Sequence, residues 1–294
     1  MNLTQLLAQS QIGIKELSNE ELKKLQRTLL EMFKDIYSAC EKHGIKVMLS
    51  GGCCLGAIRH NGFIPWDDDM DIMLMRNDYK CLPEILVAEF GNKYQCIGPN
   101  ISTNTDMAFM RIGKTGTVIR SIYDNLEQTK PIFIDVFPID NIPDSWLKRY
   151  FNALIADTLH YMALCLKYYD NRRCVAFQLL LSSKEGKKEI ARRLRIGKLL
   201  SSFTSCTSIF NMLDKFISRY PNTTRDVGVP CSRRYLHEIY PRTTILPTKQ
   251  HKFEDIQAPL PHNYDVYLKT LYKDYMQLPP EDQRRHAFWT EIEF

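Results

Sequence analysis

Residues 49–79, LSGGCCLGAIRHNGFIPWDDDMDIMLMRNDY, carry the most informative pattern in this chain. This stretch overlaps an apolar run, IKVMLS (45–50), which is typical of a β-strand, and the pair Gly51-Gly52 then leads into CCLGAIRH, which can form two helical turns. After a turn, WDDDMDIMLM (66–75) ends in a second strand pattern. The predicted order is therefore strand, glycine turn, short helix and strand.

The acidic run at the start of the second strand holds the candidate catalytic groups. Side chains at i and i+2 of a strand share a face, so Asp69 and Asp71 are predicted to point the same way. Two neighbouring carboxylates repel each other, and a divalent cation or a raised pKa resolves that repulsion. Mg²⁺ fits this pair best because it takes oxygen ligands and completes its shell with water and substrate phosphate. The alternative is a solvated acidic turn in which Asp67 or Asp68 caps residues 61–66.

A third carboxylate, Asp135, lies inside the apolar run PIFIDVFPID (131–140). An unpaired charge in such a strand is costly, so Asp135 needs a partner, and a metal ion shared with Asp69 and Asp71 is one solution. The other is an ion pair with a local arginine or a cap on the following turn. Asp140, at the end of the run, is expected in a turn.

The glycine pair offers the complementary half of a phosphate site. Backbone N–H groups of Gly51-Gly52 can approach a phosphate, and a helix N-terminus favours the anion, although a plain tight turn is the alternative. Arg111 and Lys114, on a candidate hairpin, could neutralise further phosphate charge or be solvated surface cations. Arg59 is another candidate, although a cation in the last turn of the short helix also suits the helix dipole.

The first half of the chain mixes helices and strands. An amphipathic helix is predicted at 19–43, with Ser18 as its N-cap and Glu21 completing a capping box. Two short strands between residues 107 and 122 precede the apolar strand at 131–140. This pattern predicts an α+β fold, a mixed sheet with helices, and a helical subdomain further along the chain.

Three parts are predicted along the chain. Residues 1–143 form a catalytic core with its N-terminal helix, 144–225 a helical insertion, and 226–294 a C-terminal segment that completes the substrate site. Gly186 and Gly197 are predicted joints within the insertion. In the last part, a helix is predicted over 265–278, stopped by Pro279-Pro280.

Charge and cysteine content narrow the function class. The 294 residues contain 39 Lys+Arg and 34 Asp+Glu, a formal charge of +5, which is modest for a nucleic-acid-binding protein, so no nucleic-acid partner is expected. Nine cysteines without regular spacing or a CxxC pair suit a reducing compartment rather than a disulfide framework or a zinc site. Cys53-Cys54, in an apolar context, is predicted to be core rather than a nucleophile.

The apolar and basic runs of the sequence indicate where in the cell the protein is expected. The N-terminus has no signal-peptide pattern, and the longest apolar run, 150–166, contains Asn152, Asp157 and His160, so no transmembrane segment is predicted and a cytoplasmic location is expected. The basic stretch 184–198 could lie on the anionic inner face of the membrane through an apolar side, or be a solvated helix face. The apolar side meant here consists of Ile190, Leu194, Ile196, Leu199 and Leu200.

The order strand, Gly-Gly, helix, Asp-x-Asp strand and later Asp strand resembles the nucleotidyltransferase superfamily of the DNA polymerase β type. Residues 49–79 are very similar to the signature of the LicD family of phosphotransferases, which includes the fukutin-related proteins. PIFIDVFPIDNIP (131–143) and NYDVYLKTLYKDYMQLPPEDQRRH (263–286) resemble two further blocks of that family. One departure is Lys273, where the family commonly has glycine, and it suggests a different helix end.

The resemblance implies a reaction and its partners. It implies transfer of a phospho-alcohol group, phosphocholine from CDP-choline first among them, onto a sugar hydroxyl of a cell-surface glycan such as lipopolysaccharide, teichoic acid or capsule, with release of CMP. It implies that Asp69 and Asp71 bind the metal, Mg²⁺ with Mn²⁺ as the alternative, and that Gly51-Gly52 bind phosphate. Asp135 matches the third carboxylate, as metal ligand or proton acceptor. The implied partners are a CDP-alcohol donor and a glycan or lipid-linked glycan acceptor.

A choline group would call for an aromatic cage, because quaternary ammonium prefers π faces. Trp66 lies beside the acidic strand, and four tyrosines crowd the C-terminal helix, where their spacing also suits packing against a core. These are Tyr264, Tyr267, Tyr272 and Tyr275. Ribitol, glycerol and ethanolamine remain alternative alcohols.

Two other functions remain open from the sequence. The same metal site would serve a nucleotidyltransferase that moves NMP from an NTP to a small acceptor, and the two reactions differ in which fragment stays on the acceptor. A catalytically silent nucleotide-binding protein is the third interpretation, and the presence of Asp69, Asp71, Asp135 and both glycines argues against it.

Overall fold

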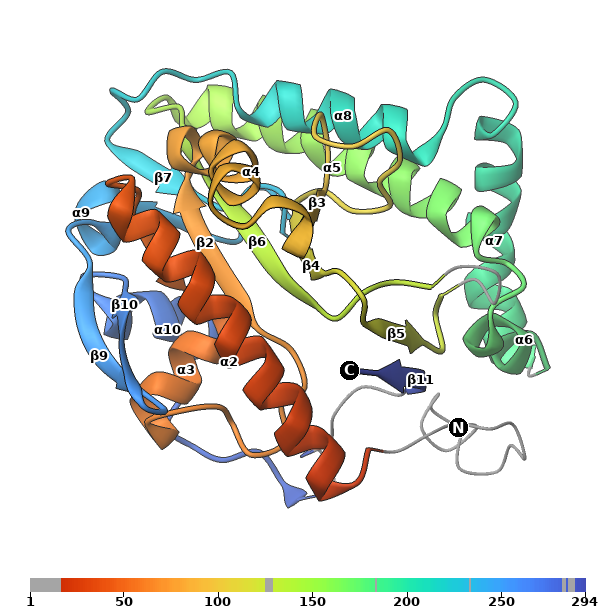
Figure 1. Ribbon diagram of the computed structural model, residues 1–294. Helices are drawn as coiled ribbons and strands as arrows, with labels where there is room; N and C mark the ends of the chain where they lie inside the picture. Colours follow the sequence, from red (N-terminus) through yellow and green to blue (C-terminus); the bar gives the residue numbers. More distant parts are fainter. Residues whose placement is uncertain (1–16, 125–128, 183, 233, 282–283, 285–288) are drawn as a thin grey trace.

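The computed structural model describes residues 17–124, 129–182, 184–232, 234–281, 284 and 289–294 (Figure 1). Its centre is a seven-stranded sheet in which β2 (Asp71–Met75) and β6 (Phe133–Ile142) are parallel neighbours and the other pairings are antiparallel. On the outer side of β2 lies β1 (Val47–Leu49), and β4 (Met110–Lys114) and β3 (Tyr94–Ile97) follow on the other side of β6. The predicted mixed sheet with helices is confirmed.

The far end of β6 changes partner. Residues 140–142 pair with β7 (Asp226–Gly228), which pairs in turn with β8 (Ile239–Pro241), so strands from the C-terminal part of the chain extend the main sheet. Two small antiparallel pairs lie beside it: β9 (Lys249–Phe253) with β10 (Ile256–Leu260), and β5 (Val118–Ser121) with β11 (Trp289–Glu293).

Two helices pack against one face of the sheet, α2 (Asn19–Lys42) and α4 (Arg76–Phe90), and the single turn η1 (Gly91–Lys93) follows α4 (Figure 1). The buried stripe of α2 includes Leu25, Leu29 and Phe33, at the spacing of one helix face. Its predicted capping box is confirmed: the N–H of Glu21 donates to Ser18 Oγ, and the N–H of Ser18 donates to Glu21 Oε2.

The predicted helical stretch after residue 143 forms four helices: α5 (Trp146–Asp170), α6 (Val175–Ser182), α7 (Lys184–Leu200) and α8 (Cys206–Ile217). The prediction that Gly186 and Gly197 are joints is wrong, because both lie inside α7. A Cβ on Gly197 would collide with the carbonyl oxygen of Cys165, so this glycine lets α7 approach α5 closely. None of the helices in the described ranges is long and apolar enough to cross a bilayer.

A buried ion-pair network joins α8 to the sheet. Arg76 donates through Nε and Nη2 to both oxygens of Asp140, at 2.6 Å each, and through Nη1 to Asp214 of α8, also at 2.6 Å. The expectation that Asp140 lies in a turn is therefore wrong. The strand continues to Ile142 because β7 takes over its pairing, and the buried carboxylate is neutralised by a guanidinium from the start of α4.

The C-terminal helices complete the fold, and α10 (Tyr264–Tyr272) ends earlier than predicted, while α9 (Arg242–Ile245) is a single turn. Lys273 stops α10 with φ 57°, six residues before Pro279. In the first part of the chain, α3 (Gly51–His60) begins at Gly51 itself. The two glycines thus form the first turn of a helix rather than a separate turn before it.

Candidate active site

The acidic run alternates between two directions. Trp289 Nε1 donates to Asp68 Oδ2 at 2.6 Å, and Met70 is fully buried in the core. Asp67, Asp69 and Asp71 alternate with these residues in the sequence, so in extended backbone they face the other way. The common face predicted for Asp69 and Asp71 therefore also includes Asp67. The sequence leaves open whether Asp67 caps residues 61–66 or belongs to the site.

The start of α3 lies directly against two of these carboxylates. A Cβ built on Gly51 would lie 3.1 Å from Asp71 Oδ2, and one built on Gly52 would lie 2.9 Å from Asp67 Oδ2. Gly51 also has φ +48°, which residues with a side chain rarely adopt. The glycine pair is thus needed for the helix terminus to approach the carboxylates.

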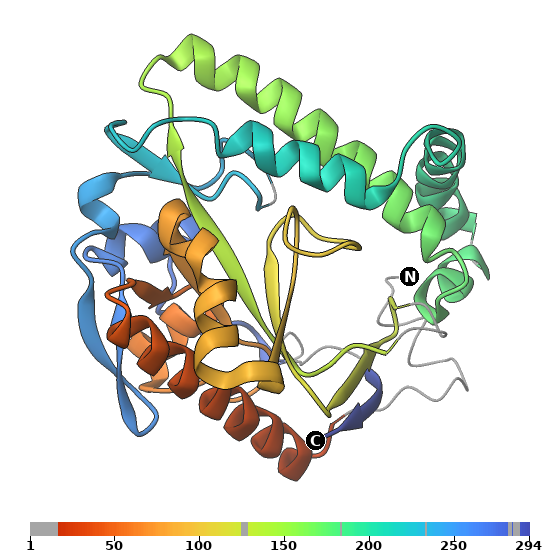
Figure 2. The same cartoon turned by 45° about the horizontal axis from the view of Figure 1, so that its top comes forward.

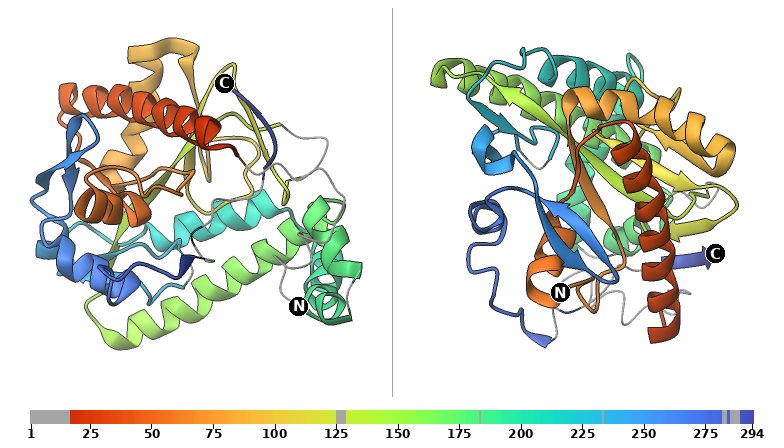
Figure 3. Two further views of the ribbon diagram at one scale, coloured as in Figure 1. Left: turned by 90° about the horizontal axis from the view of Figure 1, so that it is seen from below. Right: turned by 60° about the vertical axis from the view of Figure 1, so that its left-hand side comes forward.

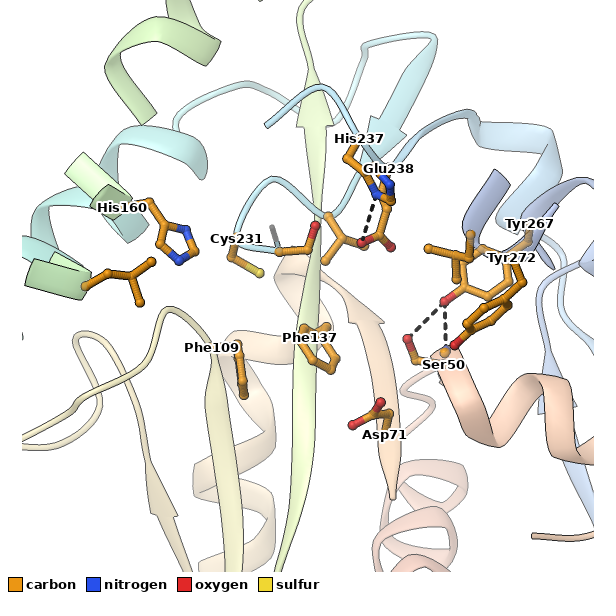
Figure 4. Close-up of a pocket in the computed structure, with 15 residues that line it drawn as sticks. Ser50, Asp71, Phe109, Phe137, His160, Cys231, His237, Glu238, Tyr267 and Tyr272 are labelled. Atoms are coloured by element: carbon orange, nitrogen blue, oxygen red, sulfur yellow. Dashed lines mark hydrogen bonds and ion pairs between the residues drawn. The ribbon is translucent and has the colours of Figure 1, made fainter. Parts of the chain in front are cut away.

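The first turn of α3 has N–H groups outside the helical ladder. The first intrahelical bond runs from Cys54 N to Ser50 O, at 3.1 Å, so the N–H groups of Gly51, Gly52 and Cys53 precede it. Gly51 N–H donates to the Tyr267 hydroxyl at 3.0 Å, and that hydroxyl also lies 3.0 Å from Ser50 Oγ (Figure 4). Tyr267, fully buried in α10, therefore fixes the turn from more than 200 residues away, which no local pattern signals.

The clustered carboxylates raise one another's pKa. Burial first, and then the negative charge of Asp68, raises the pKa of Asp67 to about 6. Burial and the charges of Asp67 and Asp68 raise the pKa of Asp69 to about 7. For Asp71, burial and the charge of Asp69 raise the pKa well above its ordinary value. The carboxylates therefore lack enough nearby positive charge to offset their mutual repulsion, and a bound cation would relieve it.

Asp135 and Arg111 lie on the next two strands of the sheet. Asp71 is the register partner of Asp135, and Asp135 is that of Arg111, so the three side chains share one face. Arg111 Nε and Nη2 donate to the two oxygens of Asp135 at 2.7 and 3.2 Å. This is the arginine pairing that the sequence leaves open for Asp135. Lys114, three residues after Arg111 on the same strand, projects to the opposite face, and the structure does not bring it to the site.

A cavity of about 780 Å³ extends from this cluster toward α5 (Figure 4). Ser50, Gly51 and Asp71 line one end, together with Tyr267 and Tyr272. The rest of the lining comes mostly from Phe109 just before β4, from β6 and α5, and from the segment between β7 and β8. It includes Phe109, Phe137, His160, Leu164, Val229, Cys231, Ser232, His237 and Glu238. Its volume lies within the usual range for small-molecule sites.

Two aromatic rings stand side by side in this cavity. Phe109 and Phe137 have ring centroids 4.4 Å apart. Phe109 precedes Arg111 by two residues and Phe137 follows Asp135 by two, so strand alternation puts both rings on the face of the ion pair. The spacing of each ring from Arg111 or Asp135 can be seen in the sequence. The strand register that brings the two rings into contact cannot be seen there.

A second cavity, of about 440 Å³, lies on the other side of Tyr272, which lines both. Arg59 lines it and donates through Nη1 to the carbonyl oxygens of Tyr275, at 2.9 Å, and Gln277, at 3.3 Å. The predicted substrate-binding residue Arg59 therefore anchors the segment after α10 and stands apart from the larger cavity. The remaining lining includes Leu55, Ile64, Trp66, Asp274, Leu278, Pro279 and Pro280.

The predicted aromatic cage is divided between the two cavities. Tyr267 and Tyr272 line the large cavity, while Trp66, Tyr272 and Tyr275 line the small one. The Tyr275 hydroxyl donates to Asp265 Oδ1 at 2.9 Å, so it supports α10. Three of the five aromatic residues therefore share the small cavity, while Tyr264 is in the lining of neither.

The acidic cluster is an incomplete metal site by itself. Over the described part of the chain, no three His, Cys, Asp or Glu side chains form a ready-made cation site. Mg²⁺ in proteins is commonly held by one or two carboxylates, with water and substrate phosphates completing the shell. Asp69 is exposed and Asp71 is partly buried, and the charge of Asp69 raises the pKa of Asp71, so the pair suits that partial role.

The sequence is similar to known proteins along most of its length. A family model described as "LicD/FKTN/FKRP, nucleotidyltransferase domain" matches residues 44–160. The chain is 26% identical to the lipopolysaccharide cholinephosphotransferase LicD of Haemophilus influenzae over 282 residues, which cover 90% of this chain and 95% of that protein. It is 35% identical to the ribitol 5-phosphate transferase FKRP of human and of mouse over 66 residues, 22% of this chain and 13% of theirs.

The matched region contains Gly51-Gly52, the carboxylates Asp69, Asp71 and Asp135, and Arg111. The sequence similarity therefore includes the candidate site. The resemblance to the LicD family that the sequence motifs indicate is thus confirmed by the family model and by the relatives. Residues 44–160 are similar to a nucleotidyltransferase domain, and most of the chain is similar to a cholinephosphotransferase.

Proposed function

We propose that this protein transfers a phospho-alcohol group, most readily phosphocholine from CDP-choline, to a sugar hydroxyl of a cell-surface glycan and releases CMP. The relatives support the class of reaction, because one is a lipopolysaccharide cholinephosphotransferase and another a ribitol 5-phosphate transferase. One observation carries the proposal: the carboxylate of Asp71 and the first turn of α3 meet at the end of a 780 Å³ cavity. A cation and a phosphate can therefore be held at the same place.

The proposed core is of the DNA polymerase β type. The support is the arrangement of β1, the α3 terminus and β2, with Asp71 and Asp135 on parallel neighbouring strands. In this arrangement the third carboxylate, Asp135, comes from β6, more than 60 residues after Asp71, as the sequence resemblance implies.

The proposed cofactor is Mg²⁺, with Mn²⁺ as the alternative, held by Asp69 and Asp71. A divalent cation there would neutralise the phosphate charge that builds up on the leaving CMP. Asp135 is proposed as the third ligand or as acceptor of the proton from the attacking hydroxyl. Its present pairing with Arg111 keeps both its oxygens in place and aims a guanidinium at the same face.

The donor phosphates are proposed to lie at the start of α3. The N–H groups of Gly52 and Cys53 and the positive end of the helix dipole favour an anion there. Arg111, whose guanidinium lies over the Phe133 ring and against Asp135, is a partly buried cation on the same sheet face. These groups orient the donor and draw electron density from its phosphates without moving a proton.

The alcohol of the donor is proposed to lie against Phe109 and Phe137. Their rings form an apolar wall in the same cavity as Asp71, and quaternary ammonium is attracted to the face of an aromatic ring. Glu238, which also lines the cavity, adds negative charge on that side. This pair replaces the tyrosine cage expected from the sequence.

The acceptor sugar is proposed to enter through the 440 Å³ cavity. Trp66 and Tyr275 offer aromatic faces there, and Asp274 and Gln277 offer hydrogen-bonding groups, a combination that suits a pyranose ring. Tyr272 lines both cavities, so an acceptor hydroxyl beside it would be close to a donor held at Gly51.

The test is ³¹P NMR of CDP-choline, CDP-ribitol, CDP-glycerol and CTP, each with the protein, Mg²⁺ and a crude glycan acceptor. We expect CMP from one CDP-alcohol and its loss in Asp69→Asn/Asp71→Asn. Asp255→Asn, which removes an exposed acid paired with Lys34 outside both cavities, is the matched control and should behave as the wild type.

Pyrophosphate released from CTP would instead assign the protein as a nucleotidyltransferase. That second candidate is favoured by the domain description of the matching family and by the same glycine turn and carboxylates. If no donor is consumed while the acidic cluster still binds Mg²⁺, the transferase proposal fails.

A further inference from the structure

The outer face of α5 is apolar along its first ten residues. Six large side chains there are between 45% and 76% exposed, with Trp146 the most exposed of them. Figure 2 and Figure 3 show α5 along the outside of the molecule, with α8 packed beside it. The six residues are Trp146, Leu147, Tyr150, Phe151, Leu154 and Ile155, and we call them the α5 outer face.

The inner face of the same helix already has its packing partners. Ala153 and Ala156 are buried, and Asn152 donates to the hydroxyls of Tyr220 and Tyr235 at 2.9 and 3.2 Å. The helix therefore packs against the protein through its inner face, and its outer face is left without a partner in the described part of the chain. A contiguous set of exposed large apolar residues on a folded protein marks an interaction surface.

The composition of the surface favours a lipid bilayer as the occupant. Trp146 and Tyr150 carry amphipathic rings of the kind enriched at membrane interfaces, and they stand among Leu, Phe and Ile side chains that can enter the acyl boundary. A helix that lies in the plane of an interface has this composition on one face.

Charge around the α5 outer face agrees with an anionic bilayer. Lys148 is exposed among the apolar residues, and Arg219 and Arg225 are exposed next to the same end of the helix. Of the nearby acids, Asp226 pairs with Arg149 at 2.6 Å, and the exposed Asp144 accepts from the N–H of Arg225 at 3.1 Å, so the exposed cations Lys148, Arg219 and Arg225 outnumber it. Exposed cations beside apolar side chains attract anionic headgroups.

The basic stretch 184–198, for which the sequence suggests a membrane contact, has only part of its apolar side exposed. Ile190 is buried, Leu194 packs against the cluster around Phe177, and Leu200 packs against the main core, whereas Leu199 is exposed. This side of α7 is therefore a smaller apolar surface than the α5 outer face. The exposed lysines Lys187 and Lys188 remain available only for electrostatic contact.

We propose that the protein binds the surface of an anionic bilayer through the α5 outer face. His160 and Leu164, further along the same helix, line the 780 Å³ cavity, so α5 carries both the outer face and part of the cavity wall. A bound protein would hold its cavity near the membrane surface, where the sugar of a lipid-linked acceptor is found. The inference needs no substrate, so it stands or falls separately from the proposed function.

The experiment is co-sedimentation of the full chain with vesicles of phosphatidylcholine alone and of phosphatidylcholine with phosphatidylglycerol, at low salt. We expect binding to the anionic vesicles and about a tenfold weaker partition for Phe151→Ser/Leu154→Ser. The matched control, Val87→Ser/Val266→Ser, removes two exposed apolar residues from α4 and α10 and should bind normally. Lys187→Gln/Lys188→Gln tests the contribution of α7 and should have a smaller effect.

A second measurement needs only a conservative change in the α5 outer face. Brominated phospholipids quench tryptophan that enters the bilayer, and Trp146 is 76% exposed whereas Trp289 is buried. We expect quenching in the wild type and its loss in Trp146→Phe, which keeps an aromatic side chain and should still sediment with vesicles.

Three results would overturn the proposal. One is no sedimentation with anionic vesicles at low salt, and another is wild-type binding by Phe151→Ser/Leu154→Ser. The third comes from sedimentation velocity without lipid: a dimeric wild type that becomes monomeric in Phe151→Ser/Leu154→Ser would mean that a second copy of this chain covers the α5 outer face.

Discussion

The α-carbon of Gly51 lies against the carboxylate of Asp71, so closely that a Cβ would be 3.1 Å from Oδ2. This contact joins the start of α3 to the first residue of β2, and it puts the positive end of a helix dipole beside an acidic cluster. A glycine is therefore required at position 51 for steric as well as conformational reasons.

Gly51→Ala should destabilise the protein by about 2 kcal/mol or more and abolish transfer, since the new methyl group meets both a φ of +48° and the Asp71 carboxylate. Gly44→Ala is the matched control: its φ is +68°, but nothing lies within 4 Å of the new Cβ. It should cost about 1 kcal/mol and leave activity unchanged. Chemical denaturation and CMP release measure the two effects, and equal losses of activity would contradict the steric argument.

The acidic cluster should make the metal-free protein less stable as pH rises. The folded-state pKa values of Asp67 and Asp69, about 6 and about 7, lie above the ordinary value of 3.8, so the folded protein holds protons that the unfolded chain has lost. Their stabilising contribution is complete below about pH 4 and is lost by about pH 7. Thermal unfolding in EDTA at pH 5 to 8 should record a falling melting temperature.

Asp69→Asn/Asp71→Asn should remove most of that fall, and in EDTA at pH 8 it should stabilise the protein by roughly 0.5–2 kcal/mol. Added Mg²⁺ should raise the melting temperature of the wild type and leave that of the variant unchanged. A wild type that gains stability between pH 5 and 7 in EDTA would show that other groups of the folded protein compensate the carboxylate charges.

Tyr267→Phe should cost about 1–3 kcal/mol, because it leaves the Gly51 N–H without its acceptor, and it should lower turnover about ten- to hundredfold by loosening the α3 turn. Tyr240→Phe is the matched control. Its ring lies 5.4 Å from that of Tyr267, and within the described ranges its buried hydroxyl has no hydrogen-bond partner, so its loss should be neutral. Equal effects of the two variants would refute the positioning role.

Lys273→Gly should stabilise the protein by about 1 kcal/mol. Lys273 ends α10 at φ 57° and ψ −106°, a conformation that suits glycine. The lysine thus adopts this helix end at a conformational cost. Lys269→Gly, the same substitution inside α10, should instead destabilise by about 1 kcal/mol, and urea denaturation compares the two.

Features with a local physical cause are predicted well from the sequence. The capping box of Ser18 and Glu21 depends on residues three apart, and the shared face of Asp69 and Asp71 depends only on strand alternation. Features with a distant partner are missed. The local sequence places Asp140 in a turn because its partner, Arg76, begins a helix 64 residues earlier, and it makes Gly197 a joint because the neighbouring Cys165 belongs to another helix.

The site divides in the same way. The carboxylates, the glycine pair and the resemblance to the LicD family are all readable in the residues, because they lie within short continuous segments or follow a short-range period. The folded arrangement adds that Arg111 neutralises Asp135, that Tyr267 fixes Gly51, and that α5 presents an apolar face to the outside. The physical reason is that strand register and helix packing set which side chains meet across the fold, and neither is encoded in the residues next to them.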